Sequence, residues 1–274
     1  MADFFAGTRP GVTVTRGGAT FELPILYFRD DAFALFFTAD YAKVKAAMPS
    51  EKLFPVAMPG GKALIGFAAF NYIETSIGPY GEIGVVAPVV YGARPLPVLP
   101  GILEARWPNF GMLVLHLPVT KTTARDAGRG VWGYTKFVAD MHFKNTPEFF
   151  ECRMDEEDSH ILTMRVAKRG FTRADRTPLV TYSVKDGKLI KTTIANRGVV
   201  SNCFLTKGSA LELGDHQVAR GIADLGLAKR PFLARYYLDR SGVLPAGEVV
   251  EEGVRPLEGY YGRDRQGELT VVNL

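Results

Sequence analysis

Runs of β-branched and aromatic residues with short apolar–polar alternations dominate the chain, and this pattern is typical of strands. Such runs lie at 19–30, 32–37, 62–74, 111–121 and 131–143. Two hairpins are predicted after them. In the first, "FFECRMD" and "HILTMRVAKRG" flank the polar turn "EEDS"; in the second, "LVTYSV" and "LIKTTIAN" flank "KDGK". Asp186-Gly187 of the second turn supplies the positive φ angles that a tight hairpin needs.

Helical patterns are fewer and shorter. "DYAKVKAAMP" (40–49) begins with Asp40 as a candidate N-cap, and Pro49 interrupts it. Residues 215–230 place apolar side chains near one face, with Asp215 as the candidate cap. The chain is therefore predicted to be mainly β, a β-rich α+β fold with a few short helices.

The segment 91–111 interrupts the strand pattern with four prolines. Each proline removes a hydrogen-bond donor from a sheet, so we predict a long irregular loop, which in compact proteins is often a lid or an interface element. No internal repeat and no linker-like change of composition is visible. We expect a single domain over residues 1–274, with this proline-rich loop as an insertion.

Composition and charge narrow the function. Of the 274 residues, 47% are hydrophobic, which is enough for a large core. The formal net charge is only +4 and no basic block is present, so we expect no nucleic-acid partner. No signal peptide and no membrane-spanning run is evident. Cys152 and Cys203 have no paired spacing and suggest buried thiols in a reducing compartment, so a soluble cytoplasmic protein is expected.

Local motifs for metal or nucleotide binding are missing from the sequence. The four histidines stand far apart, and no CxxC, GxSxG, Walker or GxGxxG pattern occurs. Asp215-His216 could belong to a proton relay, but we interpret the pair as a helix cap followed by an exposed imidazole.

Lys136 is unusual because it lies within an apolar and aromatic stretch, "GRGVWGYTKFVADM" (128–141). In a strand it would share one face with Tyr134, while Phe137 would lie on the other, and neither face is polar. A lysine in a strand is usually exposed and structural. In an apolar pocket, however, the ammonium form is destabilised and some free amine is present at neutral pH. Such an amine can form a Schiff base with a ketone.

Glu82 is a second lone charge, in the glycine-rich stretch "GPYGEIGVVAPV". Near Lys136 it could move protons to and from a substrate; the alternatives are a solvent-facing glutamate or a structural pair with an arginine. Arg29, at the end of "LPILYFRD", could hold a substrate carboxylate or orient Glu82. A surface arginine at a strand end is the alternative for that position.

Several segments resemble the acetoacetate decarboxylase superfamily in the family's order, over about residues 19–250: "FALFFTADYAKVKAAMP", "GPYGEIGVVAPV", "GRGVWGYTKF", "LELGDHQVARGIADL" and "GVLPAGEVV". The resemblance implies a cone-shaped, mainly antiparallel β-barrel with a flanking sheet, assembly into homo-oligomers, and no metal or organic cofactor. It also implies that Lys136 is the Schiff-base lysine, that Glu82 is the active-site glutamate, and that Arg29 lies near the family's active-site arginine.

The sequence also departs from the family's pattern. Phe137 stands where the decarboxylase has a second lysine, Thr135 stands where it has proline, and the apolar pair Gly66-Phe67 falls near its second carboxylate. Some members of the superfamily keep the lysine and perform aldol, dehydration or hydration chemistry on oxo acids. These differences indicate a substrate other than that of the decarboxylase.

We therefore expect a Schiff-base-forming lyase that acts on a small-molecule oxo acid, by decarboxylation or by aldolase/dehydratase-type chemistry. Lys136 and Glu82 would be catalytic, and Arg29, Tyr134 and Phe137 would bind the substrate. One alternative is a non-catalytic β-barrel that binds a carboxylate-bearing apolar or aromatic molecule. Another is a structural oligomer subunit in which Lys136 is exposed.

Overall fold

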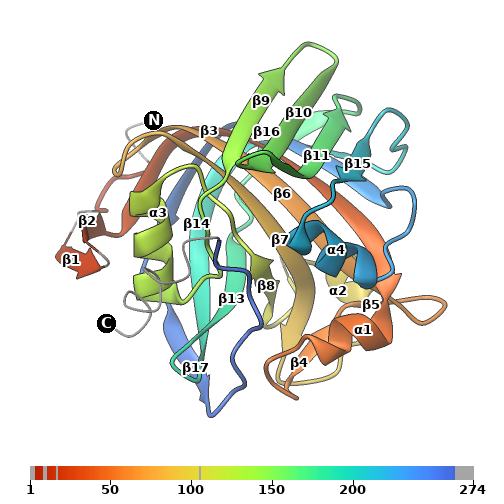
Figure 1. Ribbon diagram of the computed structural model, residues 1–274, viewed down its shortest axis with the longest axis horizontal. Helices are drawn as coiled ribbons and strands as arrows, with labels where there is room; N and C mark the ends of the chain where they lie inside the picture. The colour runs from red at the N-terminus through yellow and green to blue at the C-terminus, as the bar shows by residue number, and fades with distance from the viewer. Residues whose placement is uncertain (1–3, 9–10, 17, 105, 263–274) are drawn as a thin grey trace.

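A closed ring of seven strands forms the centre of the computed structural model, which describes residues 4–8, 11–16, 18–104 and 106–262. Neighbours in the ring run β7–β8–β13–β14–β16–β3–β6, and β6 pairs back with β7 (Figure 1). The β8–β13 pair is parallel and the other pairs are antiparallel. The strands are β3 (Ile25–Asp40), β6 (Lys62–Thr75), β7 (Tyr80–Tyr91), β8 (Phe110–His116), β13 (Leu179–Lys185), β14 (Lys188–Cys203) and β16 (Leu233–Leu244).

Shorter strands extend this barrel and flank it. β4 (Leu53–Pro55), β5 (Ala57–Met58), β12 (Thr172–Asp175) and β17 (Glu248–Glu252) pair with strands of the ring. A separate four-stranded sheet has the order β15–β11–β10–β9, and a two-stranded sheet pairs β1 with β2. Their bounds are β1 (Val12–Arg16), β2 (Ala19–Leu23), β9 (Asp140–Asn145), β10 (Phe149–Glu156), β11 (Ser159–Ala167) and β15 (Ala210–Leu213). The predicted β-rich barrel with a flanking sheet is confirmed.

The helices in the described part of the chain are short, and the longest has 8 residues. They are α1 (Tyr41–Ala46), α2 (Leu99–Ile102), α3 (Thr122–Ala127), the π-helix η1 (Gly128–Trp132) and α4 (Gln217–Asp224). Asp40 caps α1 as predicted, since its Oδ1 accepts hydrogen bonds from the backbone N–H groups of Ala42 and Lys43. None of the helices in the described ranges is both long enough and apolar enough to span a membrane.

The interpretation of Asp215 and His216 was wrong. His216, and not Asp215, caps α4, because its Nδ1 accepts the Val218 N–H at 3.2 Å. Its imidazole is buried, at 5% exposure, and Nε2 lies 2.9 Å from Glu156 Oε2. A histidine can satisfy a helix terminus with one ring nitrogen and a carboxylate with the other, which the sequence spacing alone does not reveal.

The predicted strand at 131–143 is only partly correct. Its first residues belong to η1, and Gly133 ends that helix with φ +69°. The following residues are extended and run beside 117–119, where Leu117 N donates to Thr135 O and Val119 N donates to Phe137 O. A regular strand begins only at β9. The predicted alternation of side chains nevertheless persists through the extended part.

The predicted turn and loop are as expected. Asp186 and Gly187 have φ angles of +51° and +71° in the turn that joins β13 to β14. Among the described residues between β7 and β8, the chain is irregular apart from α2. Glu104 of this loop forms an ion pair with Arg235 of β16, with Nη2 and Oε1 2.7 Å apart. The loop is therefore fastened to the barrel on which it lies.

Both faces of the barrel wall are buried, which explains why its strands read as long apolar runs. On β6 and β7, alternate residues such as Ala68, Tyr72 and Val86 face the interior. The residues between them, such as Phe67 and Val85, pack outward in a core that includes the four-stranded sheet and α4. The interior thus stays free of the main core and can hold a cavity.

Candidate active site

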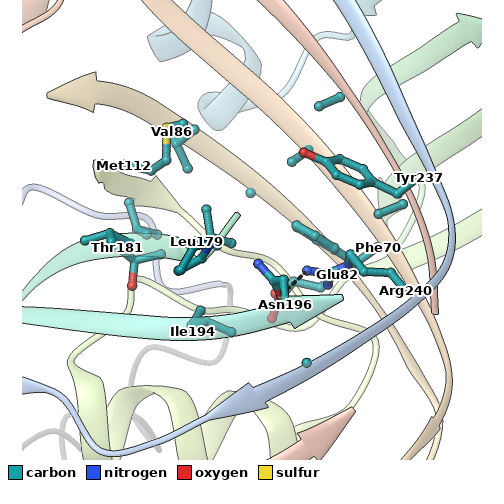
Figure 2. Close-up of a pocket in the computed structure, with 18 of the residues that line it drawn as sticks. Phe70, Glu82, Val86, Met112, Leu179, Thr181, Ile194, Asn196, Tyr237 and Arg240 are labelled. Carbon is teal, nitrogen blue, oxygen red and sulfur yellow. Dashed lines mark hydrogen bonds between the residues drawn. The ribbon is translucent and has the colours of Figure 1, made fainter. Parts of the chain in front are cut away.

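A cavity of about 170 Å³ lies inside the barrel, and each of the seven strands contributes to its wall. Figure 2 shows that several wall residues are apolar and that Glu82, Asn196 and Arg240 form a polar region on one side. Enclosed, mainly apolar cavities with a few convergent polar groups are typical ligand sites.

Lys136 and Glu82 meet in this cavity. Lys136 Nζ lies 2.5 Å from Glu82 Oε2, and the two residues are only 5% and 7% exposed. Both predicted residues are therefore brought together from segments 54 positions apart. This geometry excludes an exposed Lys136 and a solvent-facing Glu82. A buried, hydrogen-bonded amine–carboxylate pair can pass a proton between its members.

The π-helix places the lysine side chain. A Cβ added at Gly128 would lie 2.5 Å from Lys136 Cδ and closer still to Cε, so a glycine is required for this approach. The Arg129 guanidinium donates to the backbone carbonyl of Lys136 and to that of Tyr261. Gly128 and Arg129 therefore pack directly against the lysine. Such π-helical turns recur at functional sites.

Three buried tyrosines surround Glu82. Tyr72 donates its hydroxyl to Glu82 Oε1 at 3.1 Å, and the hydroxyls of Tyr27 and Tyr80 are 3.0 Å apart. Burial, together with the nearby Glu82 carboxylate, raises the pKa of all three phenols. They therefore keep their protons at neutral pH, and Tyr72 serves as a hydrogen-bond donor that stabilises the glutamate.

Tyr134 lines the cavity as predicted, but Phe137 does not. The Tyr134 ring lies 6.0 Å from Lys136 Nζ, and its hydroxyl is 2.7 Å from Thr181 Oγ1. Burial raises the pKa of Tyr134 to about 12. Phe137 is fully buried on the opposite side of the segment, with its ring 4.9 Å from that of Tyr260. Phe137 therefore packs in the core on the side of this segment that faces away from the cavity.

Arg29 is not brought into the cavity. Its side chain is exposed, because the β3–β6 register shifts on both sides of Arg29 and turns Asp30 inward instead. Two arginines of β16 line the cavity instead: Arg235, which is paired with Glu104, and Arg240, which is 6% exposed. Arg240 Nε lies 2.8 Å from Asp30 Oδ1, and its Nη1 donates to Asn196 Oδ1 at 3.0 Å. Sequence reasoning missed both members of this pair.

Burial affects the two partners differently. It raises the pKa of Asp30, and the charge on Arg240 acts against that rise. For Arg240, burial is the largest single effect and opposes the charged form, but Asp30 together with Tyr72 and Tyr237 outweighs it, and the pKa is raised. The guanidinium therefore keeps its charge. Within the described residues, no group of three or more His, Cys, Asp or Glu side chains is arranged to hold a metal ion.

The sequence contains a signal for Tyr80, which was missed, but none for the pair of Arg240 and Asp30. Tyr80 stands two positions before Glu82, so in a strand the two share a face. Arg240 and Asp30 are 210 positions apart and lie beside register shifts in both strands, so no local pattern links them.

The fold and site together define a class: a closed β-barrel whose interior holds an amine–carboxylate pair in a largely apolar cavity. The chain belongs to the acetoacetate decarboxylase (ADC) family, whose model matches residues 12–252. At the level of the family this makes it a lyase-type enzyme. None of the curated proteins matches the sequence.

Solved structures share this fold at low sequence identity. The acetoacetate decarboxylase from Legionella pneumophila aligns with a TM-score of 0.62 at 15% identity, over 89% of this chain and 93% of its own. The enduracididine biosynthesis enzyme MppR complexed with pyruvate gives 0.56 at 11% identity, over 84% and 91%. An acetoacetate decarboxylase-like enzyme from Sphingomonas wittichii RW1 gives 0.52 at 11% identity, over 84% and 94%.

Proposed function

We propose that this chain is a Schiff-base-forming lyase that acts on an oxo acid, with Lys136 as the nucleophile and Glu82 as the general acid/base. The observation that carries the proposal is the 2.5 Å contact between Lys136 Nζ and Glu82 Oε2 inside an apolar cavity. Family membership supports lyase chemistry, and the buried pair supplies the groups that such chemistry needs.

Glu82 first accepts a proton from the Lys136 ammonium, which leaves a free amine beside the bound substrate. The amine nitrogen then attacks the carbonyl carbon, and a proton moves from nitrogen to the carbonyl oxygen. Glu82 returns its proton to the resulting hydroxyl group, which leaves as water and yields a protonated imine. Tyr72 holds the carboxylate in place for both transfers, at 3.1 Å from Oε1.

The protonated imine accepts the electron pair of a neighbouring bond, and more than one outcome is open from there. Loss of carbon dioxide gives decarboxylation, while loss of a proton gives an enamine that can add to an aldehyde. The segment Gly66-Phe67, where the family's second carboxylate would fall, carries no carboxylate, and this favours the second type. MppR complexed with the condensation product of pyruvate and imidazole 4-carboxaldehyde supports such breadth within this fold.

Proton NMR of acetoacetate and of pyruvate in D₂O tests the proposal. We expect deuterium to replace the hydrogens next to the carbonyl, or carbon dioxide to be lost, faster with the protein than in buffer alone. The Lys136→Ala variant should return the rate to that of buffer, and Glu82→Gln should slow the protein-dependent rate by about 10²–10⁴-fold, the usual contribution of a general acid/base. Equal rates in the wild type and Lys136→Ala would contradict the proposal.

A non-catalytic binding barrel is the second candidate, and the largely apolar cavity wall favours it. Lys136 would then neutralise the carboxylate of the ligand. This candidate would be supported if oxo acids bind reversibly but the protein does not accelerate deuterium exchange of the hydrogens next to their carbonyl group.

A further inference from the structure

The cavity has two features that the proposed function does not use. One is Arg240, the buried arginine in its wall. The other is an apolar surface that we call the sleeve, formed by Val86, Met112, Leu179 and Ile194. Figure 2 shows the sleeve residues to one side of the cavity, with Arg240 and Asn196 on the other. Together they describe a ligand with one anionic and one apolar end.

Arg240 retains hydrogen-bonding capacity. A guanidinium has five N–H groups. Nε donates to Asp30 and Nη1 donates to Asn196, whereas Nη2 makes no hydrogen bond with any residue in the described ranges. The Phe70 ring lies under the guanidinium, 4.8 Å from Cζ, and fixes its plane. A held guanidinium of this kind suits a planar carboxylate better than a point charge would.

A short chain of contacts joins Arg240 to the reacting pair. Phe70 stacks on Tyr72 with the rings 3° from parallel, and Tyr72 donates to Glu82. Phe70 is also directly opposite Glu82 in the β6–β7 register. Residues opposite one another in adjacent strands have Cβ atoms only about 5 Å apart. A carboxylate on Arg240 would therefore lie on the side of the cavity that also carries Glu82, the hydrogen-bond partner of Lys136.

The sleeve determines what the rest of the ligand can be. Its side chains offer no hydrogen-bonding group beyond the weakly accepting sulfur of Met112. The hydroxyl of Thr181, which lies beside Leu179 in Figure 2, is already bonded to the Tyr134 hydroxyl. A polar substituent placed there would lose its bonds to water without replacement. A cavity of about 150 Å³ can bind benzene. This cavity, at about 170 Å³, is of similar size, so a phenyl ring is the upper limit for the apolar end of the ligand.

We propose that the substrate is an oxo acid with an apolar substituent of up to about the bulk of a phenyl ring. Its carboxylate binds Arg240 and its substituent fills the sleeve. This inference rests on the proposed function for the reacting carbonyl, but the two recognition elements act on any carboxylate of this shape.

Titration calorimetry with phenylacetate, acetate and phenylacetamide tests the recognition without any ketone. Phenylacetate should bind at least tenfold more tightly than acetate, which lacks the ring, and than phenylacetamide, which lacks the charge. Equal affinity for phenylacetate and acetate would overturn the role of the sleeve. Equal affinity for phenylacetate and its amide would overturn the role of Arg240.

Variants of the protein test whether the sleeve recognises the ring and whether Arg240 recognises the charge. Ala68 faces the cavity, so Ala68→Leu should weaken phenylacetate at least tenfold and leave acetate unchanged. Ala195→Leu, on an exposed side chain of β14, is the matched control and should change neither. Arg240→Lys should weaken phenylacetate but not phenylacetamide. If Arg240→Lys does not fold, the comparison of the two ligands on Lys136→Ala decides the point, because this variant lacks the competing ammonium group in the cavity.

Phenylpyruvate and pyruvate with borohydride separate this inference from the proposed function. If phenylpyruvate binds but no oxo acid is trapped on Lys136, the proposed function fails and the recognition stands. If pyruvate is trapped while phenylpyruvate neither binds nor reacts, the recognition fails and the proposed function stands.

Discussion

At the residue scale, the contact between Lys136 and Glu82 explains how two charged groups can be stable in a largely apolar cavity. Removing charges from water costs several kcal/mol for each ion, and the pair repays this only with good geometry and further hydrogen bonds. The 2.5 Å contact and the Tyr72 hydroxyl provide both. Each partner therefore depends on the other for its place in the fold.

This dependence gives a stability prediction. Lys136→Met or Glu82→Gln alone should lower the free energy of unfolding by about 3–5 kcal/mol, because each leaves its partner buried and unpaired. The double variant should lose less than the sum of the two. Urea denaturation of the four proteins measures the coupling, and strictly additive losses would contradict it.

Gly128 gives a second prediction at this scale. Gly128→Ala should displace the lysine side chain and reduce catalysis at least tenfold, because the added methyl group overlaps Lys136 Cδ and Cε. Gly221→Ala on α4 is the matched control, since nothing lies within 4 Å of its added Cβ. The control should keep full activity and gain about 0.5–1 kcal/mol of stability. Steady-state rates that are equal in both variants would refute the positioning role.

At the scale of elements, register shifts in two adjacent strands assemble the polar wall of the cavity. The shifts beside Arg29 in β3 and beside Arg240 in β16 meet where Arg240 pairs with Asp30 in the ladder. Bulges re-aim side chains and often occur next to active sites. Here they turn Asp30 and Arg240 inward and leave Arg29 outside.

Arg29 and Arg240 should therefore behave differently when substituted. Arg29→Gln is expected to change the free energy of unfolding by less than about 0.5 kcal/mol and to leave the reaction rate unchanged. Arg240→Gln is expected to cost about 3–5 kcal/mol, since it leaves the Asp30 carboxylate buried without its partner. Thermal and urea unfolding report the difference. A larger loss for Arg29→Gln than for Arg240→Gln would show that the register is misassigned.

These elements also show which residues of the site could be predicted from the sequence and which could not. Lys136, Glu82 and Tyr134 could be found because each interrupts or shares a face of a strongly apolar run, and the Asp186-Gly187 turn could be found because its chemistry is local. Arg240 could not, because its place depends on a bulge and on a partner far along the chain. The burial of His216 could not be predicted either, because its ring contacts Glu156 of β10, which is far away in the sequence.

At the scale of the whole molecule, the family match spans residues 12–252, while identity to the solved structures is 10–16%. A barrel closed by backbone ladders tolerates such divergence, because the interior wall can change without changing the strand order. The fold is therefore shared, and the composition of the cavity wall decides the substrate.

The stability of the whole molecule should depend on pH through His116. Burial, with a smaller contribution from His216, lowers the pKa of His116 to about 4 from its ordinary 6.5. Between these values the unfolded chain binds a proton that the folded chain does not. The free energy of unfolding should thus fall by up to about 3 kcal/mol as the pH drops from 6.5 to 4.

Urea unfolding at pH 7 and pH 4.5 checks this, with His116→Gln as the comparison. The variant should lose less stability than the wild type over the same interval, because glutamine does not titrate. Identical losses would indicate that other groups account for the acid sensitivity.

Borohydride trapping with peptide mapping by mass spectrometry tests the central claim most directly. The protein is incubated with acetoacetate, pyruvate or phenylpyruvate, reduced and digested. We predict that at least one of these oxo acids leaves a reduced adduct on the peptide that contains Lys136, and that Lys136→Ala abolishes it. No adduct with any of the three, or an adduct confined to other lysines, would contradict the account.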